Sequence, residues 1–496
     1  MNISKVQTFR SILYASSTKG ITLLCTAITT MVVARSLNAS DYGLVGFATI
    51  IISFLLQFTD LGLQRAAIRR PVLGIHSLQT AFTLKAILSV AAFGVALLIA
   101  PFGRRFLDHP ATGTVIRILA LNFLVSTIGF APRVALSRVM NYRALMFPAV
   151  VGAMLECIVA VVMIRLGWSY WAVVIADVVG TAATGVTMHF VKPTAVSLRI
   201  DREDAREYLR FGLPLFGSGV LIFILLNVDN FLVSIKMGSA QLGYYALAFN
   251  WSTFICMLLN ETVNAVLLPA LSIKQSDVVA MRRWYLKTIE LTGFIGVIAN
   301  TALLANAYWF LVTFLGRGSE KWLPAQTALE ILCVYGVVRA ITVPIGICIT
   351  VRGQTDLLLR ANILAGAIEV ALLALALRSN RISLVAVAVF VAYLTQAAVF
   401  LPYLRREFSI STKELLRRVW PIAPAMATGA LFTTLLPMEY GSTYFGLAVR
   451  GIFTASVVAV THGLFSGFRC FHEARELITP HYRRVVNSSR LPSVAS

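Results

Sequence analysis

The chain alternates long apolar blocks with short polar connections from one end to the other. A membrane-spanning helix needs about 20 mostly apolar residues, and about fourteen blocks reach that length. The expected spans are residues 12–37, 42–64, 79–100, 115–137, 144–166, 170–191, 211–235, 242–268, 288–315, 325–350, 357–378, 382–403, 419–437 and 442–466. The first block is too long for a signal-peptide core and is expected to stay as a helix. The pattern predicts an all-α integral membrane protein of about 14 transmembrane helices.

Composition supports a membrane class. Hydrophobic residues make up 58% of the 496 positions and charged residues 13%, with a mean hydropathy of +0.80. A soluble domain keeps roughly a quarter of its residues charged. The six cysteines and six histidines follow no metal or disulfide spacing, and most cysteines lie inside apolar blocks. We therefore expect no metal site, and we interpret the cysteines as small hydrophobic residues.

The net charge of +21 comes from short Lys and Arg clusters between the apolar blocks. Because no single basic domain exists, the charge does not indicate nucleic-acid binding. With the N-terminus in the cytoplasm, 29 of the 43 Lys and Arg residues flank cytoplasmic connections and 10 flank the opposite side. Positive residues concentrate in cytoplasmic loops. The asymmetry predicts a multi-pass protein of the cell inner membrane with both termini cytoplasmic.

A weak internal repeat divides the chain into two halves. At an offset of 200, Gly43, Ala48, Phe54 and Asp60 align with Gly243, Ala248, Phe254 and Asn260. Six helices per half give both halves the same orientation, so the predicted symmetry is a parallel pseudo-two-fold repeat, a layout found in transporters. The expected parts are an N-lobe at 1–191, a cytoplasmic amphipathic linker at 192–210, a C-lobe at 211–403, two extra helices at 404–466 and a cytoplasmic tail at 467–496.

Three segments resemble a known family. NVDNFLVSIKMGSAQLGYYALAFN carries Asp229, Gly238, Gly243, Tyr245 and Ala248 at positions typical of the polysaccharide transporter family. SLNASDYGLVGFATI with FTDLGL, and ALSRVMNYRAL after the fourth block, are also typical of it. These are the Wzx-type flippases of the multidrug/oligosaccharidyl-lipid/polysaccharide exporter superfamily. The resemblance covers residues 12–403. Within the family, the sequence is most similar to members that serve exopolysaccharides, the succinoglycan type among them.

The resemblance implies a function and its partners. A transporter of this kind opens alternately to each side and carries a polyprenyl-pyrophosphate-linked oligosaccharide unit outward, for exopolysaccharide or lipopolysaccharide synthesis. The implied partners are the lipid-linked oligosaccharide, membrane lipid and a polysaccharide polymerase or export machinery. Neither a cofactor nor nucleic acid is implied.

Ionisable residues inside the apolar blocks are the candidates for a substrate cavity. Each charge costs about 2.5–3.5 kcal/mol at the centre of a membrane helix, so those present are functional hypotheses. An anionic pyrophosphate head group needs cationic and hydrogen-bonding walls, and Lys19 is its expected contact. The candidate cavity residues are Lys19, Asp60, Lys85, Asp229, Asn260, Glu261 and Arg339.

Most of these candidates also have a structural interpretation. Lys19 and Lys85 reach the head groups by snorkelling, and Asp60 and Glu261 lie near helix ends where water solvates them. Arg339 pairs with Glu330 or a neighbouring acid. Asp229 holds the seventh helix against the first. Gly43 and Gly243 are interpreted as close-packing or helix-start positions.

Two other functions use the same features. An ion-coupled drug or cation exporter shares this architecture, and a net acidic cavity would favour it. A membrane-embedded polysaccharide polymerase usually needs a large extramembrane loop or catalytic domain, and no connection here is longer than about twenty residues. The sequence has no phosphate loop, nucleophile elbow or paired catalytic carboxylates on a polar domain, so we expect no enzyme activity.

The charge asymmetry predicts the side on which each connection lies. Reporters fused after Ser239 and after Lys321 should be outside the membrane, and a reporter fused after Gln275 should stay in the cytoplasm. Paired phosphatase and fluorescent-protein fusions measure this. A cytoplasmic signal at Lys321 would overturn the orientation of the ninth and tenth helices.

Overall fold

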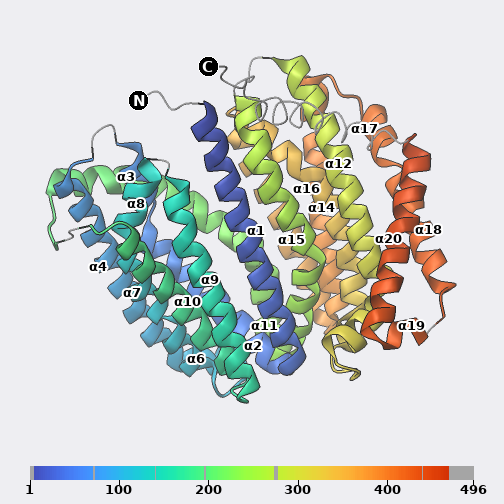
Figure 1. Ribbon diagram of the computed structural model, residues 1–496, viewed down its shortest axis with the longest axis horizontal. Coiled ribbons are helices and arrows are strands. Elements are labelled where there is room, and N and C mark those ends of the chain that lie inside the picture. Colours follow the sequence, from blue (N-terminus) through green and yellow to red (C-terminus); the bar gives the residue numbers. More distant parts are fainter. Residues whose placement is uncertain are drawn as a thin grey trace, which may run out of the picture. The chain divides into compact units, whose positions relative to one another are not determined.

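The computed structural model describes residues 5–70, 73–139, 141–194, 197–272, 277–437 and 439–467. Figure 1 shows helices joined by short connections. Within these ranges ten helices are long and apolar enough to cross a membrane, or eleven with one bent pair. The all-α membrane fold is confirmed, and the count of fourteen spans stays a prediction. The predicted tail lies outside the described residues, apart from its first position.

The chain divides into two compact units. Unit 1 consists of Met1–Asn250, Leu315–Ala328 and Gly366–Val389, and unit 2 consists of Trp251–Phe314, Leu329–Ala365 and Phe390–Ser496. These units interleave along the sequence, whereas the lobes predicted above are continuous. The lobe boundaries therefore stay a prediction.

Unit 1 begins with the elements before residue 250. These are α1 (Lys5–Ser36), α2 (Ala39–Asp60), α3 (Leu63–Arg69), α4 (Ile75–Ile99), η1 (Ala100–Phe102), α5 (Gly103–Phe106), α6 (Thr112–Leu119), α7 (Leu121–Ile128), α8 (Phe130–Arg138), α9 (Tyr142–Arg165), α10 (Tyr170–Val191) and the first part of α11 (Arg202–Ser272). Asn38 caps α2 by accepting a 2.7 Å bond from the Asp41 backbone N–H, as helix starts require.

The fourth predicted span is broken rather than straight. Its pieces are α6, α7 and α8, and the chain bends by 47° between Ile128 and Phe130. Gly129 at the bend packs against α10, because a Cβ there would lie 3.1 Å from the Cα atom of Gly185. Pro132 is tolerated because it lies in the first turn of α8, where its missing N–H has no helical partner.

The helix α11 contains a hairpin. Gly238 has φ 83° and ψ 179°, a conformation that glycine adopts readily and other residues do not. The Tyr245 hydroxyl donates a 2.6 Å bond to an Asp229 carboxylate oxygen. In a straight helix those residues would be about 24 Å apart, at about 1.5 Å per residue. The chain therefore folds back at Gly238, within the connection that the sequence predicts between its seventh and eighth helices.

The start of α11 is held against the α3–α4 turn by polar contacts. The Arg70 guanidinium donates to Asp204 and Glu207 and lies 4.8 Å from the centre of the Tyr208 ring. The Tyr208 hydroxyl and Ser77 Oγ are 2.6 Å apart. Burial lowers the pKa of Arg70, but its bonds to Glu207 and Asp204 outweigh burial and raise the pKa above its usual value. Arg70 therefore stays charged and fixes this segment.

The end of α1 is capped by the later segment of unit 1 at 315–328. The Trp322 indole N–H donates 2.8 Å to the Ala34 carbonyl. The Lys321 ammonium donates to the carbonyls of Arg35 and Leu37 at 2.8 and 3.0 Å. Helix ends leave carbonyls without helical partners, and these donors supply them.

Unit 2 is also helical. Its elements are the end of α11, α12 (Val278–Ala305), α13 (Ala307–Trp309), η2 (Phe310–Leu315, which ends in unit 1), parts of α14 (Gln326–Val351), α15 (Thr355–Ala376) and α16 (Ile382–Phe408), and α17 (Thr412–Val419), α18 (Ile422–Thr434), α19 (Glu439–Ser442) and α20 (Tyr444–Ser466). Two short 3-10 turns, η3 (Leu323–Ala325) and η4 (Leu377–Ser379), belong to unit 1.

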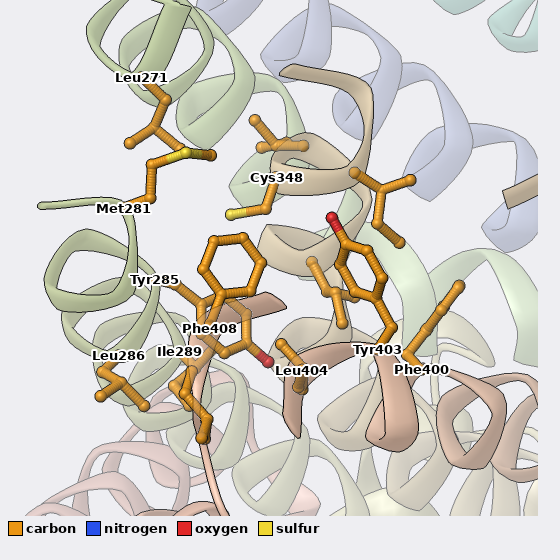
Figure 2. Packing of buried hydrophobic residues seen from close by; sticks show 14 of the residues in the cluster. Leu271, Met281, Tyr285, Leu286, Ile289, Cys348, Phe400, Tyr403, Leu404 and Phe408 are labelled. Carbon is orange, nitrogen blue, oxygen red and sulfur yellow. The ribbon is translucent and has the colours of Figure 1, made fainter. Parts of the chain in front are cut away.

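A buried apolar cluster joins α12, α14 and α16 in unit 2 (Figure 2). The rings of Tyr285 and Phe408 stack with centroids 6.5 Å apart, and Tyr403 meets Phe408 edge-on at 5.9 Å. Cys348 is fully buried beside them. This cysteine is a packing residue, as the sequence indicates.

The helices α2 and α11 approach closely at a pair of glycines. A Cβ on Gly43 would lie 1.9 Å from the Ser239 carbonyl oxygen, and a Cβ on Gly243 would lie 1.9 Å from the Ala39 carbonyl oxygen. Gly43 and Gly243 align in the internal repeat. A pseudo-two-fold axis brings equivalent positions of two repeats into contact in this way. The close-packing role expected for both glycines is confirmed.

The glycine contact yields a stability prediction. Gly43→Ala should destabilise the folded protein by about 1–3 kcal/mol, because overpacking displaces backbone rather than a flexible side chain. A thermal melt of the detergent-solubilised protein, followed by size-exclusion chromatography, measures it. Gly46→Ala on the same helix is the control, because a Cβ there meets nothing within 4 Å. Equal melting of the two variants would contradict the close contact.

Candidate functional site

A buried lysine marks the centre of the candidate site in unit 1. Lys85 on α4 is 6% exposed, and its Nζ donates a 2.6 Å bond to Thr59 Oγ1. Thr59 is fully buried, and its hydroxyl in turn donates to the Leu56 carbonyl at 2.9 Å. The ammonium group therefore points toward the end of α2. Within unit 1 the Lys85 ammonium thus has a side-chain partner on the neighbouring helix.

An aspartate and an arginine complete the group with Lys85. Asp60, the last residue of α2, lies within electrostatic range of both Lys85 and Arg133. Arg133 belongs to α8 and is exposed on the surface of its helix. We call Thr59, Asp60, Lys85 and Arg133 the basic cluster. It contains two cations and one carboxylate, so it carries one positive charge without a partner inside the cluster.

A tight turn fixes the position of Asp60. Leu61 and Gly62 follow it with φ values of 39° and 70°, and they separate α2 from α3. The left-handed conformation suits Gly62 and leaves Leu61 strained. A Cβ on Gly212 would lie 2.0 Å from the Leu61 carbonyl oxygen, so α11 packs directly on this turn. The FTDLGL motif thus builds the corner that holds Asp60.

Asp229 has a different environment. It is 3% exposed, accepts the Tyr245 bond across the α11 hairpin and accepts a 3.1 Å bond from Asn230 Nδ2. Glu369 on α15, also in unit 1, lies within electrostatic range of it. Asp229 is therefore a structural link, as one interpretation expects, but its partner is the other arm of α11 rather than α1.

The remaining candidates are Lys19, Asn260, Glu261 and Arg339. Lys19 and Glu261 lie in α1 and α11, but their side chains are outside the described residues. Asn260 is exposed on α11, and Arg339 lies on α14; both belong to unit 2. The Arg339 guanidinium donates a 3.0 Å bond to the Tyr335 hydroxyl, in place of the expected acid partner.

One further charge inside a span has a structural role. Arg450 on α20 is 5% exposed. Its guanidinium donates 3.1 Å bonds to Asn306 Oδ1 and to the backbone carbonyls of Thr433, Leu436 and Pro437. Thr433 lies in the last turn of α18, and Leu436 and Pro437 follow its end, where helical carbonyls need other donors. Arg450 therefore caps α18 and is not a free cation.

Arg133 is not among the residues predicted from the sequence. It lies near the end of the predicted span 115–137 and is counted with a cytoplasmic connection, because a straight helix gives it no reason to approach Lys85. The 47° bend before α8 supplies that reason. The sequence did contain one signal for such a bend, namely a glycine inside an apolar span with an arginine four positions after it.

An apolar cavity of about 620 Å³ lies in unit 1 between α2, the α4–α5 corner and the first arm of α11. Most of its walls are aromatic or aliphatic. Its polar lining residues are Arg105 and Asn227, and the Arg105 guanidinium lies 5.4 Å from the centre of the Phe102 ring. Such a cavity suits a hydrocarbon chain whose polar end meets a cation.

Solved structures show the same fold. The lipid II flippase MurJ, in an inward closed conformation, aligns with a TM-score of 0.75 at 13% identity, over 91% of this chain and 98% of that chain. An inward-facing multidrug resistance MATE family transporter aligns with a TM-score of 0.61 at 15% identity, over 81% and 95%. At these identities the likeness concerns the fold alone.

Sequence relatives and a family model also match the chain. The lipopolysaccharide biosynthesis protein WzxC of Escherichia coli K12 is 22% identical over 340 residues, 67% of each chain. The teichuronic acid biosynthesis protein TuaB of Bacillus subtilis is 22% identical over 300 residues, 60% of this chain and 62% of that protein. The family described as "Polysaccharide biosynthesis protein" matches residues 32–327, more than half of the chain. Because this match covers more than half of the chain, the chain belongs to the polysaccharide biosynthesis protein family.

Proposed function

We propose that the protein is a flippase that moves a polyprenyl-pyrophosphate-linked oligosaccharide unit across the cytoplasmic membrane. The basic cluster is the observation that carries this proposal. The cluster has two cations, Lys85 and Arg133, and one carboxylate, Asp60, so one positive charge is left over. A charge among membrane helices is costly and usually functional. A pyrophosphate is the part of such a lipid that needs a cation on its path.

The magnitude of the attraction is sufficient for a binding step. Two unit charges 4 Å apart at an effective dielectric near 20 attract by about 4 kcal/mol before desolvation. Arg133 is exposed and offers a planar fork that matches phosphate oxygens. Lys85 is buried within electrostatic range of Arg133 and raises the local positive potential. We assign the first contact to Arg133 and the supporting charge to Lys85.

The hydrocarbon part of the substrate needs an apolar path beside the charged one. The cavity of about 620 Å³ provides an apolar surface within unit 1, lined by Phe54, Phe223 and Phe231 among others. Arg105 and Asn227 give it a polar end. We assign this cavity to the polyprenyl chain. The substrate is then carried without any bond being made or broken.

The names of the relatives agree with this proposal. WzxC and TuaB are named for the biosynthesis of lipopolysaccharide and teichuronic acid, and MurJ is named as a lipid II flippase. All three concern cell-envelope polymers. We place this protein in the same kind of pathway, with both termini in the cytoplasm, and we expect it to hand its product to a polysaccharide polymerase.

A cation or drug exporter is the alternative with the same fold. The sign of the charge discriminates between them, because a pocket that selects organic cations needs net negative charge. The net-positive basic cluster favours an anionic substrate. Competition for binding between a lipid pyrophosphate and an organic cation would separate the two classes.

Loss of the protein should stop surface polysaccharide without stopping assembly of its lipid-linked unit. The unit should accumulate in the membrane and should be recovered by solvent extraction and mass spectrometry. Expression of the full-length chain should restore surface polysaccharide. If the lipid-linked unit fails to form in the deletion strain, the protein acts upstream and the proposal is wrong.

Removing charge from the basic cluster should reduce export. Lys85→Met and Arg133→Ala should each lower the rate at least tenfold, since about 1.4 kcal/mol corresponds to a factor of ten, and Arg133→Lys should recover part of it. Surface polysaccharide is measured at equal protein abundance. Arg143→Ala removes a nearby cation outside the cluster and should export normally. Normal export by Lys85→Met and Arg133→Ala would remove the basis for the pyrophosphate contact.

A further inference from the structure

A basic surface lies in unit 2, where α16 ends and the short helix α17 begins. Arg405 and Arg406 occupy the last turn of α16, and Lys413 and Arg417 lie one turn apart on α17. All four side chains are exposed. We call these four residues the α16–α17 cations. They belong neither to the basic cluster nor to the apolar cavity of unit 1, and the proposed substrate contacts do not use them.

The carboxylates of the neighbouring helices are already paired. The helices α12, α16 and α17 carry one carboxylate each. Each is paired with an arginine outside the four, in the ion pairs Glu290–Arg418 (2.7 Å), Glu407–Arg352 (2.8 Å) and Glu414–Arg282 (2.7 Å). In the part of unit 2 that the structure describes, none of the α16–α17 cations forms an ion pair. The counter-charge for these four residues therefore comes from the surroundings.

Two of these ion pairs determine which face of α17 is exposed. Glu414 and Arg418 lie one turn apart and hold one side of α17 against α12. Leu415 packs against the buried apolar cluster of unit 2. Leu416 is 61% exposed, and Trp420, directly after the helix, is 48% exposed. Helical spacing places both beside the two cations of α17. The exposed face of α17 is therefore half apolar and half basic.

A surface cavity lies beside the two arginines of α16. Its volume is about 520 Å³, and it is lined by Leu401, Pro402, Arg405, Arg406 and Thr412. The two apolar residues lie one turn before the arginines, on a helix that is long and apolar enough to cross a membrane. The cavity thus has an apolar wall on the membrane side of two guanidinium groups. A guanidinium matches the oxygens of a phosphate group.

The apolar part of this surface determines the kind of ligand. A soluble anion or an acidic protein segment would contact the cations and leave Leu416 and Trp420 in water. A phospholipid supplies phosphate at the level of the cations and hydrocarbon directly below them. Tryptophan is typical of this interface, and amphipathic helices lie in it with basic residues on their polar side. Clusters of Lys and Arg beside a membrane helix attract lipids with a net negative charge.

We propose that the α16–α17 cations and the cavity beside them form a binding site for an anionic phospholipid. The lipid phosphate contacts Arg405 and Arg406, and its acyl chains follow the apolar wall of the cavity. The charge asymmetry of the sequence predicts that this connection is cytoplasmic, so the lipid belongs to the inner leaflet. Its binding holds α17 in the plane of the head groups and fixes the corner between α16 and α18. The site does not depend on the proposed flippase function.

Native mass spectrometry of the purified full-length protein in detergent, titrated with phosphatidylglycerol, tests the site. Wild-type protein should bind this lipid saturably and at least tenfold more tightly than phosphatidylcholine. The double variants Arg405→Ala with Arg406→Ala and Lys413→Ala with Arg417→Ala should each weaken phosphatidylglycerol binding at least tenfold and leave phosphatidylcholine binding unchanged. Leu416→Gln should weaken the binding of both lipids, because it removes a hydrocarbon contact and keeps the charges.

A matched control removes the same charge from the opposite end of α16. Arg378 and Arg381 are exposed arginines in the connection before this helix, and Arg378→Ala with Arg381→Ala should bind phosphatidylglycerol as wild type does. Equal weakening in this control overturns the site, because the effect would then follow net charge alone. Equal affinity of the wild type for the two lipids overturns it as well. So does wild-type binding by both double variants at unchanged thermal stability, or displacement of the lipid by equimolar inorganic phosphate.

Discussion

An ammonium group inside a membrane protein needs polar partners, and Lys85 finds them at the end of α2. Its bond to Thr59 and its proximity to Asp60 tie α4 to α2 where α2 turns into α3. That turn depends on Gly62 and on the close approach of Gly212 from α11. The broken α8 then adds Arg133 to the same place. Three separate helices are thus arranged around one buried charge.

Glycine contacts give unit 1 the close helix spacing that such polar groups need. Gly43 and Gly243 let α2 meet α11 at backbone distance, and Gly180 lets α10 accept Glu156. Helices in lipid gain little from the hydrophobic effect, so small residues at their interfaces supply the packing that holds them together. The polar groups lie at positions that this packing creates.

The sequence predicts the elements better than their mutual arrangement. Apolar block length locates the helices, and Gly238 falls within a predicted connection, because lipid requires continuous apolar helices. Lys85 and Asp60 are recognisable as candidates from the sequence, since a charge in an apolar block is rare, and the structure brings the two together. Arg133 is missed because the bend at Gly129 depends on packing against Gly185, which no local pattern reveals. The partner of Asp229 is likewise set by the hairpin geometry. The assignment of Asn260 and Arg339 to unit 2 depends on contacts distant in sequence.

The bond between Asp229 and Tyr245 also bears on how the chain enters the bilayer during synthesis. Its two ends are only 16 positions apart, on the two arms of one hairpin. Once Tyr245 has left the ribosome, its hydroxyl group is available to donate a hydrogen bond to the Asp229 carboxylate. Glu369, the other carboxyl group near Asp229, is synthesised much later. The two arms can therefore move from the translocon into lipid as a pair, with the acid already hydrogen-bonded. Because the partner of Asp229 is local, insertion of this segment does not depend on the C-terminal half of the protein.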